Sequence, residues 1–152
     1  MFFIKCAAIF IGTFGYATII NIPKKHLFHT AFTAMAGYCV FLLMLPSEII
    51  GCFLGACVIA ALGEIFSRTL KDAATLFIIP GIIPLVPGAK LYNMTLSLIR
   101  QDFNEAATLG VQVLMYAGGI AIAILLVSST VRSVTGYASK LKKNKRKGSL
   151  QR

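Results

Sequence analysis

The feature that most constrains this sequence is an apolar stretch, residues 78–88, that contains three prolines and two glycines. Each proline removes a backbone N–H and prevents the carbonyl four residues earlier from making its helical hydrogen bond. The stretch lies among long apolar segments, so we expect it at membrane depth. Unpaired backbone groups are costly in lipid, so a broken helix is tolerable there only where it packs inside protein or lines a wet cavity.

Two functions fit such a break. Transporters use interrupted helices as binding sites, because freed carbonyls and half-helix ends provide ligands. A proline-kinked helix that only shapes the helix bundle fits the same residues equally well. In the first interpretation, residues of the break and two polar residues after it line the path of a substrate: Pro80, Gly81, Pro84, Pro87, Gly88, Tyr92 and Asn93. Lys90 also follows the break at once.

The composition is that of a membrane protein. Of the 152 residues, 57% are hydrophobic and 13% are charged, whereas a soluble domain carries roughly 25% charged residues. Several segments approach or exceed the roughly 17–25 apolar residues that cross a bilayer. We therefore predict an all-α integral membrane protein, with one transmembrane domain over residues 1–132 and no separate soluble domain.

The net charge of +10 comes from the C-terminal end. Eight of the fifteen basic residues lie from Arg132 onward, where no acidic residue occurs. This pattern favours a cytoplasmic, disordered tail over residues 133–152 that contacts anionic lipid. It does not indicate a nucleic-acid partner, because the rest of the chain is nearly neutral.

Five apolar segments are predicted to span the membrane, and the fourth contains the break: residues 2–22, 27–45, 49–66, 73–98 and 106–131. Basic clusters favour the cytoplasmic side, and they occur at Lys24-Lys25, at Arg68 with Lys71, and in the tail. Five spans with the N-terminus outside place all three clusters in the cytoplasm. Four spans and a re-entrant loop would place the tail outside.

Charged residues at the end of the third segment form a second candidate site. Glu64, Arg68 and Asp72 follow one another at four-residue steps, so a continuous helix would align them as a ladder on one face. A salt-bridge ladder at the cytoplasmic rim is the simpler interpretation. The alternative is a proton-coupling role for Glu64 with Arg68, because acids within membranes tend to be functional.

No pattern in the sequence indicates catalysis, a metal or a cofactor. The motifs of metalloproteases, serine hydrolases and phosphate-binding loops do not occur. His26 and His29 have no carboxylate or cysteine nearby in the sequence to complete a metal site, so we expect an interfacial role for them. The four cysteines lack CxxC spacing and are interpreted as structural thiols.

The run Ile79-Pro80-Gly81-Ile82-Ile83-Pro84-Leu85-Val86-Pro87-Gly88, with Tyr92 four residues later, resembles the signature of the threonine/serine exporter family. Asn21-Ile22-Pro23 before basic residues, and Glu64 with Arg68 before the signature, also fit. More narrowly, the sequence resembles the small, separately encoded subunit of that family, which includes bacterial succinate-export components.

This resemblance covers about residues 10–130 and implies a function. It implies a subunit of a two-component exporter in the bacterial inner membrane, driven by the proton motive force and paired with a larger transmembrane subunit. Its substrate would be a small polar metabolite, threonine or serine in one branch and succinate in another. A membrane scaffold or assembly subunit without substrate contacts remains an alternative of a different class.

Overall fold

The computed structural model describes residues 2–149, and within that range the side chains except those at positions 46, 132 and 134–149. All regular structure in these residues is helical, which confirms the all-α prediction. The elements are α1 (Phe2–Ile19), α2 (Lys24–Leu43), η1 (Leu45–Ser47), α3 (Glu48–Leu70), α4 (Thr75–Ile82), η2 (Ile83–Leu85), α5 (Gly88–Ile99) and α6 (Phe103–Ser149).

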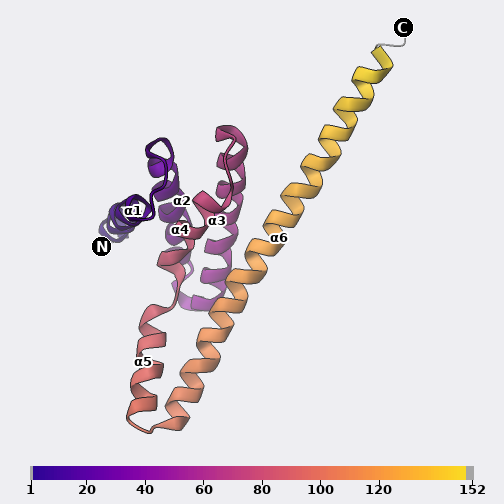
Figure 1. Cartoon of the computed structure of the whole chain (residues 1–152). Coiled ribbons are helices and arrows are strands. Elements are labelled where there is room, and N and C mark those ends of the chain that lie inside the picture. Colours follow the sequence, from indigo (N-terminus) through magenta and orange to yellow (C-terminus); the bar gives the residue numbers. More distant parts are fainter. Residues whose placement is uncertain (1, 150–152) are drawn as a thin grey trace.

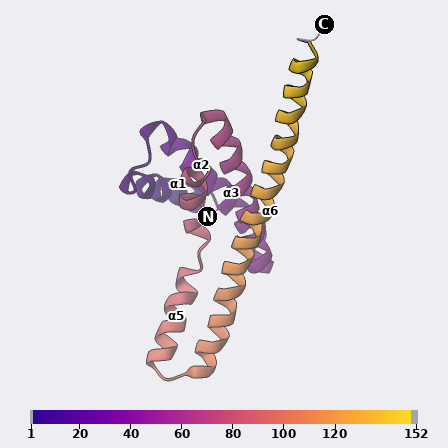
Figure 2. The same ribbon diagram turned by 45° about the vertical axis from the view of Figure 1, so that its right-hand side comes forward.

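The helices are arranged around an antiparallel pair, α2 and α3 (Figure 1). α1 packs on α2, α4 packs on both α2 and α3, and α6 runs along α3. α5 pairs with the first turns of α6, and this hairpin extends beyond the turn between α2 and α3 in both views (Figures 1 and 2). α4 and α5 together therefore run the length of the bundle.

Within residues 2–149, four helices are long and apolar enough to cross a membrane: α1, α2, α3 and α6. The α4–η2 segment and α5 pass the same test only as a pair, which is bent by 54° at the break. This pair coincides with the predicted fourth span, residues 73–98. The described part of the chain thus has four candidate spans, or five if the bent pair is one span.

The close packing of α2 against α3 depends on two glycines that face each other. A Cβ on Gly55 would lie 2.8 Å from the carbonyl oxygen of Gly37, and a Cβ on Gly37 would lie 2.9 Å from the carbonyl oxygen of Gly55. The Gly51-x-x-x-Gly55 spacing in the sequence is typical of such close helix contacts in lipid. Around this crossing lies the main buried cluster: Cys52, Ala56, Ile59, Ile78, Leu85, Tyr116, Ile120 and Ala123.

The structure corrects the predicted ladder of three charges. α3 ends at Leu70, and Lys71 turns the chain with a left-handed φ of 56°. Asp72 therefore leaves the helix face that carries Glu64 and Arg68, and it pairs with α2 instead. Local propensity gave no sign of this stop, because no glycine or proline occurs there.

The last helix is longer than expected. The backbone of α6 is helical to Ser149, whereas the sequence suggested a disordered tail from residue 133. The side chains of the basic cluster in this tail lie outside the described part of the chain, so their contact with anionic lipid stays a prediction.

Candidate functional site

The bundle itself satisfies a carbonyl that the break exposes. Pro80 lies inside α4 and leaves the Leu76 carbonyl without its helical partner. The Thr30 hydroxyl of α2, which is fully buried, donates to that carbonyl at 3.4 Å. The Ile83 carbonyl, which Pro87 would leave unpaired in a continuous helix, accepts from the Val86 N–H at 3.2 Å. The break is thus held by protein contacts.

The first half of the break is buried in the bundle. Pro80 and Gly81 are buried, and a Cβ on Gly81 would lie 2.8 Å from the Ile59 side chain. Pro80 and Pro84 also face a cavity of about 220 Å³ between the break and α1, whose α1 wall includes Thr13 and Tyr16. This cavity is largely apolar, so it offers few groups to a polar ligand.

The second half of the break faces outward. Pro87 is half-buried and ends the break, and Gly88 is exposed at the start of α5. Tyr92 is 68% exposed and Asn93 is also exposed, so both lie on the surface of α5. Their predicted role along a substrate path stays a prediction.

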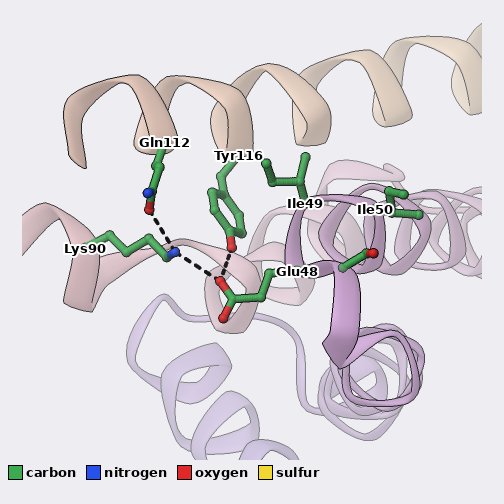
Figure 3. A pocket seen from close by; sticks show the side chains of 7 residues that line it. Glu48, Ile49, Ile50, Lys90, Gln112 and Tyr116 are labelled. Carbon is green, nitrogen blue, oxygen red and sulfur yellow. Dashed lines mark hydrogen bonds and ion pairs between the residues drawn. The ribbon is translucent and has the colours of Figure 1, made fainter. Parts of the chain in front are cut away.

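A charged pocket lies directly after the break (Figure 3). Lys90, in the first turn of α5, places its Nζ 3.0 Å from Oε2 of Glu48, the first residue of α3. Lys90 also donates to Gln112 Oε1 of α6 at 3.0 Å, and the Tyr116 hydroxyl donates to the same Glu48 oxygen. The pocket measures about 540 Å³ and is also lined by Ser47, Ile49 and Ile50.

Local structure explains how these four side chains meet. Gln112 and Tyr116 are four residues apart on α6, so they share one face of that helix. Glu48 lies at the N-terminus of α3, where the helix dipole stabilises a carboxylate. Because α5 begins at Gly88, Lys90 projects from its first turn toward both helices.

The pocket offers one carboxylate, one ammonium, one amide and two hydroxyls, those of Tyr116 and Ser47. Glu48 and Lys90 keep 48% and 31% of their side chains exposed, so solvent and small molecules can reach them. No group of three metal-ligating side chains occurs in the described residues. The arrangement therefore suits a small polar molecule that carries charge.

Sequence reasoning identified only one member of this pocket in connection with the break, Lys90. The sequence alone did not indicate Glu48, Gln112 or Tyr116 as site residues. Two polar residues at helical spacing within the otherwise apolar segment 106–131 were the available signal. Their partner on α3 could not be found without the tertiary arrangement.

Glu64 and Arg68 lie at the other end of α3. Glu64 is 5% exposed, and its Oε2 is 3.8 Å from an Arg68 guanidinium nitrogen, which also donates to the Val131 carbonyl at 3.1 Å. Glu64 borders a cavity of about 360 Å³ together with Ser128 and Ser129 of α6. Its burial does not fit a simple solvated rim ladder.

His26 has a carboxylate partner that its neighbourhood in the sequence did not reveal. Its buried Nε2 lies 2.6 Å from Asp72 Oδ2, and Lys25 Nζ lies 3.0 Å from the same oxygen. Hydrogen bonds from Lys25 and from His26 hold the pKa of Asp72 below its usual value. This cluster ties the connection between α3 and α4 to the start of α2.

Comparison with known proteins identifies the family. An uncharacterized protein of Haemophilus influenzae is 29% identical over 89 residues, which cover 57% of this chain and 30% of that protein. The chain thus matches less than a third of that relative's length, and no solved structure matches it. The model of the threonine/serine exporter family, ThrE, matches residues 5–130. This multi-pass membrane protein belongs to the threonine/serine exporter family, a family of transporters.

Proposed function

We propose that this chain is the small subunit of a two-component exporter that moves threonine or serine out of a bacterial cell across the cytoplasmic membrane. The observation that carries the proposal is the Glu48–Lys90 pair in an open pocket beside the break. Within a transporter family, a solvent-accessible pair of opposite charges next to an interrupted helix is suited to a charged, polar cargo.

The proposed topology has five spans, with the bent α4–α5 pair as the fourth. The N-terminus lies outside and α6 ends in the cytoplasm, so that the basic residues at Lys24-Lys25 and Arg68 lie inside. Glu48 and Arg68 are twenty residues apart on α3, or about 30 Å, which matches the hydrocarbon thickness of a bilayer. The charged pocket is then near the outer end and Glu64 near the inner end.

A larger transmembrane subunit is proposed as the partner. The pocket is bordered by α3, α5 and α6, and its charged pair stays accessible, since Glu48 keeps 48% of its side chain exposed. Transport sites commonly lie between two such halves, so a partner could complete this one.

Deletion of the gene in its own host, followed by complementation, tests the proposal. Cells are fed a threonine-containing dipeptide, and intracellular and released threonine are measured with and without an uncoupler of the proton gradient. We expect the deletion strain to accumulate threonine and the full chain to restore its release. Normal threonine release in the deletion strain, with succinate retained instead, would contradict the proposed substrate.

A purification from the same host tests the partner. The tagged chain is extracted in mild detergent, and the proteins that remain bound are identified by mass spectrometry. A second membrane protein of the same family, needed for the same export, is the expected result. A chain that restores export alone in liposomes would contradict the two-component arrangement.

A further inference from the structure

The charged pocket has the groups needed to bind both the ammonium and the carboxylate of an amino acid. We propose that Glu48 and Lys90 bind the α-ammonium and the α-carboxylate of the exported substrate, and that Glu48 excludes dicarboxylates. This inference rests on the proposed export of amino acids, and it adds the site and the basis of selectivity.

The present contacts show how a ligand could enter. Glu48 and Lys90 are joined directly at 3.0 Å, and each has a further neutral partner on α6. Gln112 accepts from Lys90, and Tyr116 donates to Glu48. When the ion pair between Glu48 and Lys90 separates, Tyr116 still holds Glu48 and Gln112 still holds Lys90. The two charges then stay in place beside residues that are one turn of α6 apart.

A zwitterionic ligand can replace the contact between Glu48 and Lys90 and still leave both side chains paired with an opposite charge. Its carboxylate takes the place of Glu48 beside Lys90, and its ammonium takes the place of Lys90 beside Glu48. A ligand with both charges makes two charge-assisted hydrogen bonds here, one to Glu48 and one to Lys90, whereas a simple amine or monocarboxylate makes only one. The pocket volume of about 540 Å³ leaves ample room for a small amino acid.

A dicarboxylate is expected to bind this pocket poorly. Its first carboxylate could pair with Lys90, but its second would approach Glu48, and like charges at short range repel each other. Glu48 is therefore the residue that should separate amino-acid export from succinate export. Lys90 is needed for either type of ligand.

Equilibrium binding of labelled L-threonine to membranes of the native host tests this site, because any partner subunit is then present. The full chain is compared with Glu48→Gln and Lys90→Gln, and unlabelled succinate is added as a competitor. We expect both substitutions to weaken threonine binding by about tenfold or more. Only Glu48→Gln should make succinate an effective competitor, since it removes the repelling charge and retains Lys90.

Two further variants separate binding from folding. Tyr116→Phe keeps the ring and removes only the hydroxyl that holds Glu48, so it should weaken threonine binding by a smaller factor, about threefold. Glu105→Gln is the control: this carboxylate bonds Ser97 at 2.8 Å, outside the pocket, and its replacement should leave binding unchanged. Thermal unfolding in detergent is measured for each variant.

The outcomes distinguish the two proposals. Wild-type threonine binding and no succinate competition in Glu48→Gln would overturn the site and leave the proposed export intact. A lower unfolding temperature of Glu48→Gln would then indicate that the Glu48–Lys90 pair serves only the stability of the fold. Absence of threonine binding and of threonine export in the wild type would overturn both proposals.

Discussion

The Thr30 hydroxyl donates to the Leu76 carbonyl, the group that Pro80 leaves without a partner inside α4. The donor comes from α2, forty-six residues earlier in the chain. A break at membrane depth is thus stabilised by a side chain of a neighbouring helix, as the scarcity of water in lipid requires. This bond also fixes α4 against α2 just before the chain bends toward the charged pocket.

Replacing Thr30 with valine removes this donor at nearly constant volume. The Leu76 carbonyl then loses its partner in a buried environment, which should destabilise the fold by about 1–3 kcal/mol. Thermal unfolding in detergent measures the change. Thr33→Val is the matched control, because Thr33 is also fully buried on α2 but bonds the His29 carbonyl within its own helix. Equal losses in both variants would contradict a special role for Thr30.

The glycine contact between α2 and α3 predicts a second effect. Alanine normally stabilises a helix relative to glycine by about 1 kcal/mol, but at Gly55 its Cβ would lie 2.8 Å from the Gly37 carbonyl oxygen. The helices must separate, so Gly55→Ala should be destabilising, by about 1–3 kcal/mol. Gly12→Ala has open space around its Cβ and should be neutral or stabilising. Unfolding temperatures of the two variants decide the point.

Much of the fold could be predicted because the apolar segments are long and the membrane restricts the possible structures. Each of the four helices able to span a membrane matches a predicted segment, and the bend lies at the predicted break. The end of α3 at Leu70 could not be predicted, because the left-handed Lys71 that stops the helix has no distinctive sequence. The prediction of Asp72 on the same face failed for that reason.

The Asp72 cluster predicts a pH dependence. Hydrogen bonds from Lys25 and from His26 lower the pKa of Asp72. A lowered carboxyl pKa means that the stabilisation is present above the pKa of the unfolded state, about 3.9, and is lost as the pH falls through the folded value. Asp72→Asn should therefore lower the unfolding temperature at pH 7. At a pH low enough to protonate Asp72 in the folded protein, the variant and the wild type should unfold alike; an equal difference at pH 7 and at that low pH would contradict this.

Glu64 is the candidate for proton coupling. It is buried, borders a cavity between α3, α4 and α6, and lies 3.8 Å from the Arg68 guanidinium. We expect Glu64→Gln to reach the membrane and to export threonine with little dependence on external pH. The measurement is export at several pH values, with Glu105→Gln for comparison. If the pH dependence of the Gln variant equals that of the wild type, Glu64 has no part in the coupling.

The candidate site was predicted less completely than the fold. The break pointed to the region beside this pocket, because prolines within an apolar run are visible in any sequence, and Lys90 follows directly. Glu48 begins α3, forty-two residues earlier, and Gln112 and Tyr116 come from the next span. Only the packing of α3, α5 and α6 brings them together, and that packing depends on contacts between distant residues.

The break itself gives the last prediction. Pro84 lies in η2 and Pro87 directly precedes α5, and the chain bends by 54° between the two helical segments. Alanine at both positions supplies two N–H donors and removes the steric obstacle to a continuous helix, so the segment should straighten. Lys90 would then leave the position from which it contacts Glu48.

We expect Pro84→Ala combined with Pro87→Ala to keep or raise the unfolding temperature and to abolish export. Pro80→Ala is the comparison, because it restores the bond of Leu76 but leaves the bend, and it should retain most of the export. Export by the complemented deletion strain and thermal unfolding are measured together. A modest loss in the double variant that second-site packing changes restore would instead support a kink that only shapes the bundle. Unchanged export would favour a scaffold subunit, because it would show that transport does not need the bend.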